Sequence, residues 1–220
     1  MKKYINFINY LMMAVILGLD IWYILQGGLW LKTLTSSIFV LLGIINLIYA
    51  IKSKCSLKFP IILVVALAVA MAGDVVINID FMSGAIIFAL GHVFYIIAYS
   101  FIEKFEWKNL IFASAIFVPS LLIILLLPVL NFDESIMKVI CCIYALIISI
   151  MVGKAIANYL KDKSLCNLMI LIGSALFFIS DFMLLLDVFG HVNLTGLFCL
   201  LTYYPGQILI AYSVKHYVEK

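Results

Sequence analysis

The sequence predicts an all-α integral membrane protein, folded as one bundle of eight transmembrane helices. Of its 220 residues, 67% are hydrophobic and 11% are charged, whereas soluble domains carry about 25% charged residues. The mean hydropathy is +1.26, and eight apolar stretches follow one another with short breaks between them. No polar linker interrupts the series, so we expect residues 1–220 to form a single transmembrane domain.

Each apolar stretch is close to the roughly 20 residues that a helix needs to cross about 30 Å of hydrocarbon. The breaks carry turn and charge signals such as "QGGLWLK", "DFMSG" and "FGHVN". The predicted helices cover residues 5–26, 34–51, 60–79, 82–102, 109–130, 135–160, 165–188 and 193–217.

Lysines predict the orientation, since the chain contains no arginine. Of the 14 lysines, 12 lie near one set of helix ends, and Lys32 and Lys138 lie near the other. Both termini are therefore expected in the cytoplasm, with the first apolar stretch retained as a helix. We interpret the lysines and the net charge of +3 as topology signals, which give no reason to expect a nucleic-acid partner. A multi-pass protein of the bacterial inner membrane is the predicted location.

Two aspartates fall inside apolar helices at similar depth. Asp74 and Asp181 each lie about six residues, or roughly 8 Å, short of the outer end of a helix that runs outward. An ionised carboxylate at that depth costs several kcal/mol without partners, so both are candidate functional residues. Asp80 and Asp187 follow them at the outer mouth, and Asp20 is interpreted as interfacial.

The third and seventh predicted helices share a direction and stand four spans apart. The fourth and eighth end in "IIAYS" (96–100) and "LIAYS" (209–213). This pattern suggests a duplication, with repeats 1–104 and 105–220. Asp74 and Asp181 are then expected to face one cavity.

The fourth and eighth helices add polar side chains with helical spacing. His92 and Tyr95 share a face of the fourth helix, as Tyr203 and Gln207 do on the eighth. Asn78 lies one turn above Asp74. We expect these residues to line a polar cavity in the outer half of the bundle.

The motifs "AGDVVIN", "FALGHVFYIIAY", "GSALFFISDFMLLLDVF" and "LLTYYPGQILIAYS" resemble, in order and spacing, the signature of the YhhN family, whose animal members are lysoplasmalogenases. The resemblance implies an eight-helix membrane enzyme that cleaves the vinyl ether bond of lysoplasmenyl-ethanolamine or -choline. The products are a fatty aldehyde and glycerophospho-ethanolamine or -choline. The resemblance assigns catalysis to Asp74 and Asp181. The other positions that match the family motifs are Gly91, His92, Tyr95, Thr202, Tyr203, Tyr204 and Gln207.

Vinyl ether hydrolysis begins with protonation of the alkene carbon distal to oxygen, and water then adds to the oxocarbenium ion. One carboxylic acid and one carboxylate suffice, as in glycoside hydrolysis. We assign Asp181 as the acid, because phenylalanines and leucines surround it. Asp74 is assigned as the base, with hydrogen bonds expected from Asn78 and His92, and the reverse assignment stays open. Tyr203 and Tyr204 are candidate contacts for a lysophospholipid head group in the bilayer, with Asp80 and Asp187 as counter-charges.

Three other interpretations fit parts of the pattern. Intramembrane aspartates can join helices, and paired carboxylates can couple protons in a transporter. A metal-dependent intramembrane lipid hydrolase needs about three histidine ligands, and His92 is the one histidine deep in a span. We therefore predict no metal and no cofactor. The sequence indicates no oligomeric state.

Overall fold

The computed structural model describes residues 2–132 and 134–219, and in these residues all regular structure is helical. Eight helices there are long and apolar enough to cross a membrane, which confirms the predicted fold class. They are α1 (Lys2–Gln26), α2 (Leu29–Lys52), α3 (Lys58–Val76), α4 (Phe81–Ile102), α5 (Lys108–Leu126), α6 (Ser135–Lys161), α7 (Leu165–Gly190) and α8 (Thr195–Val218).

The second helix begins earlier than the hydropathy pattern predicts. Gly27 and Gly28 form the turn from α1 with φ values of 67° and 98°, a backbone region that glycine enters without steric cost. Because the turn is so short, α2 starts at Leu29 instead of residue 34. Lys32 therefore lies in the first turn of a membrane helix, where it is buried.

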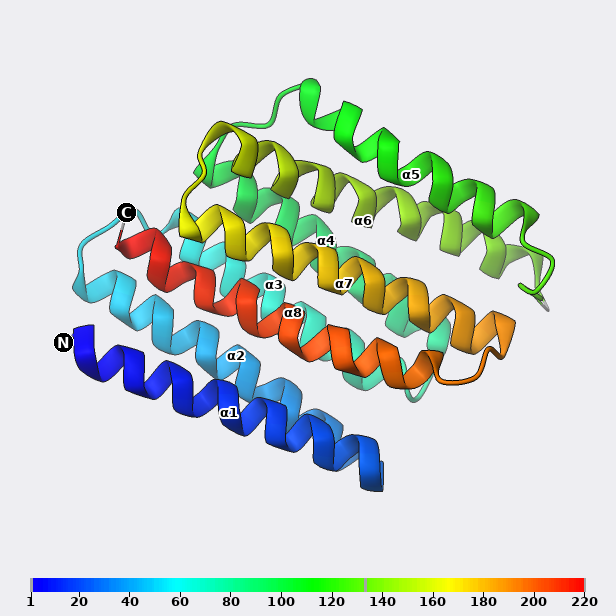
Figure 1. Ribbon diagram of the computed structural model, residues 1–220, viewed down its shortest axis with the longest axis horizontal. Helices are drawn as coiled ribbons and strands as arrows, with labels where there is room; N and C mark the ends of the chain where they lie inside the picture. Colours follow the sequence, from blue (N-terminus) through cyan, green and yellow to red (C-terminus); the bar gives the residue numbers. More distant parts are fainter. Residues whose placement is uncertain (1, 133, 220) are drawn as a thin grey trace.

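The helices lie side by side, with α1 along one edge of the bundle and α5 along the opposite edge (Figure 1). Between them, α3 packs on α4 and α7 packs on α8. The start of α1 and the end of α8 lie at the same end of the bundle (Figure 1). This is the arrangement that an even number of spans requires, and the cytoplasmic location of that end stays a prediction.

The helix pairs repeat with a shift of four. Contacts of α1 with α2, α2 with α3 and α3 with α4 correspond to those of α5 with α6, α6 with α7 and α7 with α8. The crossing contact of α2 with α8 likewise corresponds to that of α6 with α4. The duplication itself stays a prediction, and this packing is what it requires.

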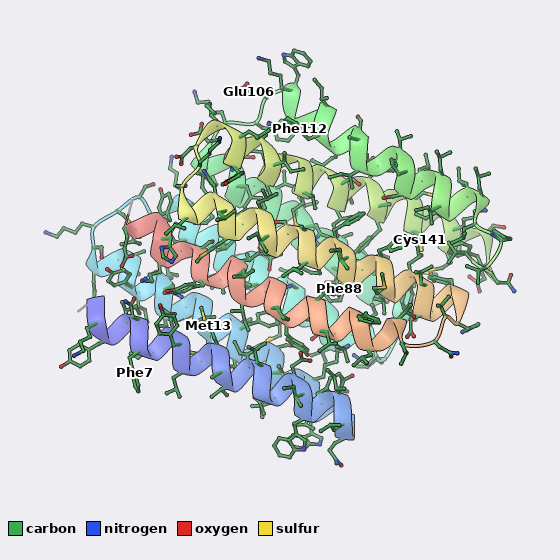
Figure 2. The ribbon with its side chains drawn as sticks, in the orientation of Figure 1. Phe7, Met13, Phe88, Glu106, Phe112 and Cys141 are labelled. Carbon is green, nitrogen blue, oxygen red and sulfur yellow. The ribbon has the colours of Figure 1, made fainter. Side chains whose placement is uncertain are left out.

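Small residues set the closest helix contacts. A Cβ atom placed on Gly173 of α7 would lie 2.9 Å from the carbonyl oxygen of Gly206 on α8, and one on Gly153 of α6 would lie 2.6 Å from the backbone nitrogen of Ala113 on α5. Such close approach is how helices gain packing energy in lipid, where burial of apolar surface alone drives little association. Large apolar side chains project outward, as Phe7 does, whereas Phe88 packs inside (Figure 2).

Candidate active site

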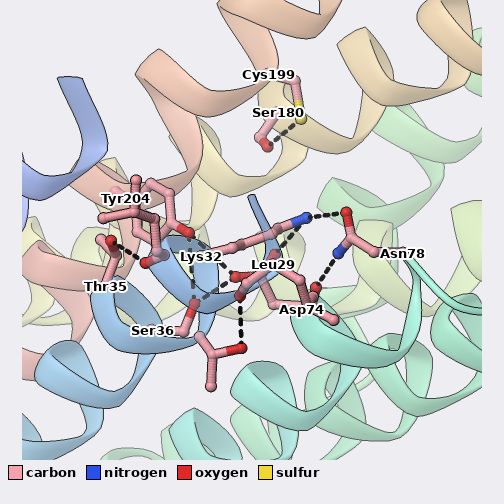
Figure 3. A network of polar contacts seen from close by, with 11 residues as sticks. Leu29, Lys32, Thr35, Ser36, Asp74, Asn78, Ser180, Cys199 and Tyr204 are labelled. Carbon is pink, nitrogen blue, oxygen red and sulfur yellow. Dashed lines mark hydrogen bonds and ion pairs between the residues drawn. The ribbon is translucent and has the colours of Figure 1, made fainter. Parts of the chain in front are cut away.

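The carboxylate of Asp74 on α3 is buried among polar groups from two other helices (Figure 3). Lys32 Nζ on α2 lies 3.1 Å from Asp74 Oδ1. On the other oxygen, Oδ2, the carboxylate accepts hydrogen bonds from the Ser36 hydroxyl of α2 and from the Tyr204 hydroxyl of α8, the latter at 3.2 Å. A cation and two hydroxyl donors are the partners that a buried carboxylate needs to stay ionised.

Asn78 completes this cluster by holding the lysine. Its side-chain nitrogen donates to the backbone carbonyl of Asp74 at 2.7 Å, and its Oδ1 accepts from Lys32 Nζ at 3.4 Å. The interpretation of Lys32 as a topology signal was wrong, because the side chain is an internal ion-pair partner. The spacing of Lys32 and Ser36, at i and i+4 on one helix face, was the sequence signal for it.

Asp20 on α1 belongs to the same region of the bundle. It is 2% exposed and lies within electrostatic range of Asp74. The side chain is therefore covered by the bundle, and its expected place at the membrane interface stays a prediction. Because α1 packs against both α2 and α8, a side chain near its outer end is covered by the bundle instead of facing water.

Asp181 on α7 has a different set of partners. The Tyr144 hydroxyl of α6 donates to Asp181 Oδ2 at 2.7 Å. His92 Nε2 of α4 lies 2.7 Å from that hydroxyl and 3.3 Å from Asp181 Oδ2. The expected hydrogen bond from His92 to Asp74 was wrong, because α4 turns this face toward α6 and α7. Sequence reasoning missed Tyr144, which stands in the apolar run "ICCIYALII" with no motif around it.

The hydrogen-bond geometry indicates the tautomer of His92. Tyr144 has one hydroxyl proton, which it donates to Asp181, so the short contact with His92 requires a proton on Nε2. His92 Nδ1 is buried and has no hydrogen-bond partner among the described residues. A proton there would be an unpaired buried donor, which is costly. In the tautomer that these contacts favour, His92 donates from Nε2 toward Tyr144 and Asp181.

An apolar pocket opens beside Asp181, between α4, α5, α6 and α7 and the end of α3. Both hydrogen bonds that Asp181 accepts from the described residues fall on Oδ2, so Oδ1 has no hydrogen-bond partner among them. Its lining is Ile77, Phe81, Ala85, Phe88, Ser120, Ile124, Ile140, Cys141, Tyr144, Ala145, Ile148, Phe178, Asp181, Phe182, Leu184, Leu185 and Phe189.

The two aspartates do not share this pocket, contrary to the expectation of one cavity lined by both. Asp74 is absent from the lining and lies in its own polar cluster. Tyr203 of α8 is placed between the clusters, within electrostatic range of both carboxylates. Its hydroxyl is buried and has no hydrogen-bond partner among the described residues. The pocket is also more apolar than the periodicity suggested, because Tyr95 and Gln207 pair with each other outside it.

That pair joins the centre of the bundle. The Tyr95 hydroxyl of α4 donates to Gln207 Oε1 of α8 at 2.7 Å, and both side chains are fully buried. A hydrogen bond between neutral groups at this position ties the two helices together. It also sets the rotation of α4, which carries His92 one turn earlier.

Asp80 and Asp187 cap helices at the outer end. Asp80 Oδ2 accepts from the backbone nitrogen of Ser83 at 2.7 Å, at the start of α4. The hydrogen bonds from Ser83 lower the pKa of the Asp80 carboxyl. Asp187 Oδ1 accepts from the backbone nitrogen of Gly196 at 3.1 Å, near the start of α8. Each carboxylate satisfies an orphan N–H group, and a role toward a head group stays a prediction.

The two aspartate clusters are built from corresponding helices. Asp74 on α3 is contacted from α2 and α8, and Asp181 on α7 is contacted from α6 and α4. A shift of four helices relates the two sets. Their chemistry differs, because Asp74 has a cationic partner whereas Asp181 has a phenol and a neutral imidazole beside an apolar pocket.

No group of three or more His, Cys, Asp and Glu side chains within residues 2–132 and 134–219 is arranged to hold a metal ion. None of the five cysteines forms a disulfide bond within the described residues. The described residues therefore contain no set of side chains of the kind that a metal-dependent hydrolase would use as ligands.

Together these features define a multi-pass helical membrane protein with two internal carboxylates held by side chains of neighbouring helices. The model of the YhhN family matches residues 29–214, and the chain belongs to the YhhN family. The matched range contains Lys32, Asp74, His92, Tyr144 and Asp181. Comparison with curated proteins and with solved structures finds no match.

Proposed function

We propose that this protein is a membrane hydrolase that cleaves the vinyl ether bond of a lysoplasmalogen. The products are a fatty aldehyde and glycerophosphoethanolamine or glycerophosphocholine. The observation that carries the proposal is the unequal environment of two intramembrane carboxyl groups. Asp74 is ion-paired to Lys32, whereas Asp181 borders an apolar pocket with one oxygen available. Membership in the YhhN family supports it.

Asp181 acts as the general acid. Its Oδ1–H bond breaks as a C–H bond forms at the alkene carbon distal to the ether oxygen, using the π electron pair. The oxocarbenium ion that results is attacked by water at the carbon next to oxygen. The hemiacetal then collapses to aldehyde and alcohol.

Asp74 supplies the negative charge and the base. Lys32 and the Ser36 and Tyr204 hydroxyls favour its ionised form, in which it stabilises the developing cation and accepts a proton from the attacking water. Because Asp74 does not line the pocket, the proposal requires this proton to pass by way of the Tyr203 hydroxyl, which is within electrostatic range of both carboxylates and has no other hydrogen-bond partner among the described residues. When the hemiacetal collapses, its hydroxyl loses a proton as the C=O bond forms, the C–O bond to glycerol breaks, and the leaving ether oxygen takes up one proton, so this step is neutral overall. The proton that Asp74 took from water then returns to Asp181.

The pocket suits the single hydrocarbon chain of a lysophospholipid. Its wall is made almost entirely of aliphatic and aromatic side chains, with Asp181, Tyr144, Ser120 and Cys141 as the polar exceptions. A bond roughly 8 Å below the outer boundary is at the right depth for the glycerol-proximal end of a chain whose head group stays at the interface.

Aldehyde release by the detergent-purified protein tests the proposal. Lysoplasmenyl-ethanolamine and -choline are supplied in parallel with the ester lysophospholipid of the same head group and chain length. We expect aldehyde from the vinyl ethers, no fatty acid from the esters, and loss of turnover in Asp181→Asn and Asp74→Asn. Both variants are checked for monodispersity and melting temperature. Undiminished turnover in both variants, or hydrolysis of the ester alone, contradicts the proposal.

A further inference from the structure

Tyr144 contacts Asp181 but lies outside the four sequence motifs that resemble the YhhN family. It lies on α6, which contributes nothing to the four motifs. Its ring is part of the pocket wall, and its hydroxyl is 2.7 Å from both Asp181 Oδ2 and His92 Nε2. Three helices therefore meet at one phenolic oxygen beside the candidate acid.

The direction of these hydrogen bonds places the acidic proton. Tyr144 donates to Asp181 Oδ2, and His92 Nε2, which carries a proton, points at the same oxygen from 3.3 Å. An oxygen that accepts two hydrogen bonds is not the oxygen that carries the proton of a carboxylic acid. In the protonated form that the proposed function requires, the proton of Asp181 therefore lies on Oδ1, which accepts no hydrogen bond from the described residues.

We propose that Tyr144, with His92 behind it, is a positioning residue that holds the proton of Asp181 on Oδ1 and stabilises the carboxylate formed when that proton leaves. This inference rests on the proposed function of Asp181 as general acid. In the transfer, the Oδ1–H bond breaks and its electron pair stays on the carboxylate. The two donors on Oδ2 then become charge-assisted hydrogen bonds, which are stronger than neutral ones.

Other tyrosines of the bundle show what a purely structural role looks like. Tyr95 pairs with Gln207 and Tyr99 with Ser174, at 2.7 Å and 3.0 Å. All four side chains are completely buried and their partners are neutral amide or hydroxyl groups. Tyr144 differs in both respects, because it is partly exposed to the pocket and its partner is ionisable.

Other titratable groups around Asp181 come from α8 and α6. Cys199 and Tyr203 of α8 lie within electrostatic range of Asp181, and Cys141 of α6 lies near Tyr144. None of these three has a hydrogen bond to the Asp181 carboxyl in the described structure. A change at the Tyr144 hydroxyl therefore acts on Asp181 directly.

Tyr144→Phe keeps the ring in the pocket wall and removes only the donor. We expect kcat for aldehyde release to fall about 10- to 100-fold, the usual effect of losing one hydrogen bond to a charged group, with KM changed less than about threefold. The high-pH limb of the kcat profile reports loss of the acidic proton. It should move to higher pH in Tyr144→Phe, because the carboxylate has lost a stabilising donor.

Tyr99→Phe is the matched control, since it removes a buried hydroxyl from the same bundle but away from the pocket. It should leave kcat within about twofold and the pH profile in place. A Tyr144→Phe enzyme with wild-type kcat, or with a lowered kcat and an unmoved high-pH limb, overturns the positioning role. A wild-type protein that releases no aldehyde instead refutes the proposed function.

His92→Asn supplies the second variant if Tyr144→Phe does not survive purification. The neutral donor behind Tyr144 is then lost while Tyr144 keeps its bond to Asp181. The same limb should move in the same direction, by a smaller amount. A limb that stays at its wild-type position in a folded His92→Asn protein contradicts the inference.

Discussion

Lys32 Nζ lies 3.1 Å from Asp74 Oδ1, and both side chains are almost fully buried. Removing one partner of such a pair leaves an uncompensated internal charge, which costs far more than the pair contributes by its presence. The pair therefore couples α2 to α3 and favours the ionised form of Asp74 that the role proposed above requires.

Lys32→Met should destabilise the protein by about 3 kcal/mol, because Asp74 is left as an unpaired buried charge. The double variant Lys32→Met with Asp74→Asn should regain much of that loss, since neither side chain is then charged. Thermal unfolding in detergent measures both. Equal melting temperatures for the wild type and Lys32→Met would show that the lysine does not carry this charge balance.

Asp181→Asn should lower kcat for aldehyde release by about 100-fold or more, because an amide has no acidic proton to give to the alkene carbon. Folding should survive, since the asparagine carbonyl oxygen can still accept from Tyr144. Steady-state kinetics with lysoplasmenylcholine, together with gel filtration, separates the two effects. A kcat near the wild-type value would remove Asp181 from the role of acid.

Ala145→Phe should narrow the pocket, because Ala145 is buried in the α6 wall near Tyr144. We expect activity on long-chain substrates to fall more than activity on short-chain ones, by about tenfold in kcat/KM for the longest chains. Leu146→Phe, which faces outward on the same helix, is the control. An equal loss of kcat/KM for substrates of all lengths would mean that the hydrocarbon chain of the substrate does not lie in this pocket.

Asp80→Ala should lower stability at neutral pH and leave it unchanged at low pH. The folded-state pKa of Asp80 is depressed by Ser83, so its contribution is present above the unfolded pKa of about 3.9 and is lost as pH falls through the folded value. Melting temperatures of wild type and Asp80→Ala at pH 7 and near the lowest pH that the fold tolerates check this. A difference in melting temperature that is the same at low pH as at pH 7 would show that the effect of Asp80→Ala does not come from the helix cap.

Part of the candidate site was visible in the sequence. The positions of Asp74 and Asp181 within their helices follow from counting residues along apolar stretches, at about 1.5 Å each. Asn78 lies one turn from Asp74 as expected, because a residue four positions on lies over the same helix face, but it donates to the Asp74 backbone carbonyl instead of the carboxylate. His92 was assigned to the wrong aspartate, and Tyr144 was not found, because both depend on contacts between helices far apart in the chain.

The number of spans and the depth of each polar group are properties of single helices, so hydropathy and helical rise were enough to predict them. Which carboxylate meets a lysine, and which meets a phenol and an imidazole, depends on how α2, α4, α6 and α8 are ordered and rotated around α3 and α7. That choice is made by close packing at glycines such as Gly173 and Gly206, whose effect appears only when two helices come together. The pocket beside Asp181 has the same origin, since four helices define it jointly and no one of them encodes its shape.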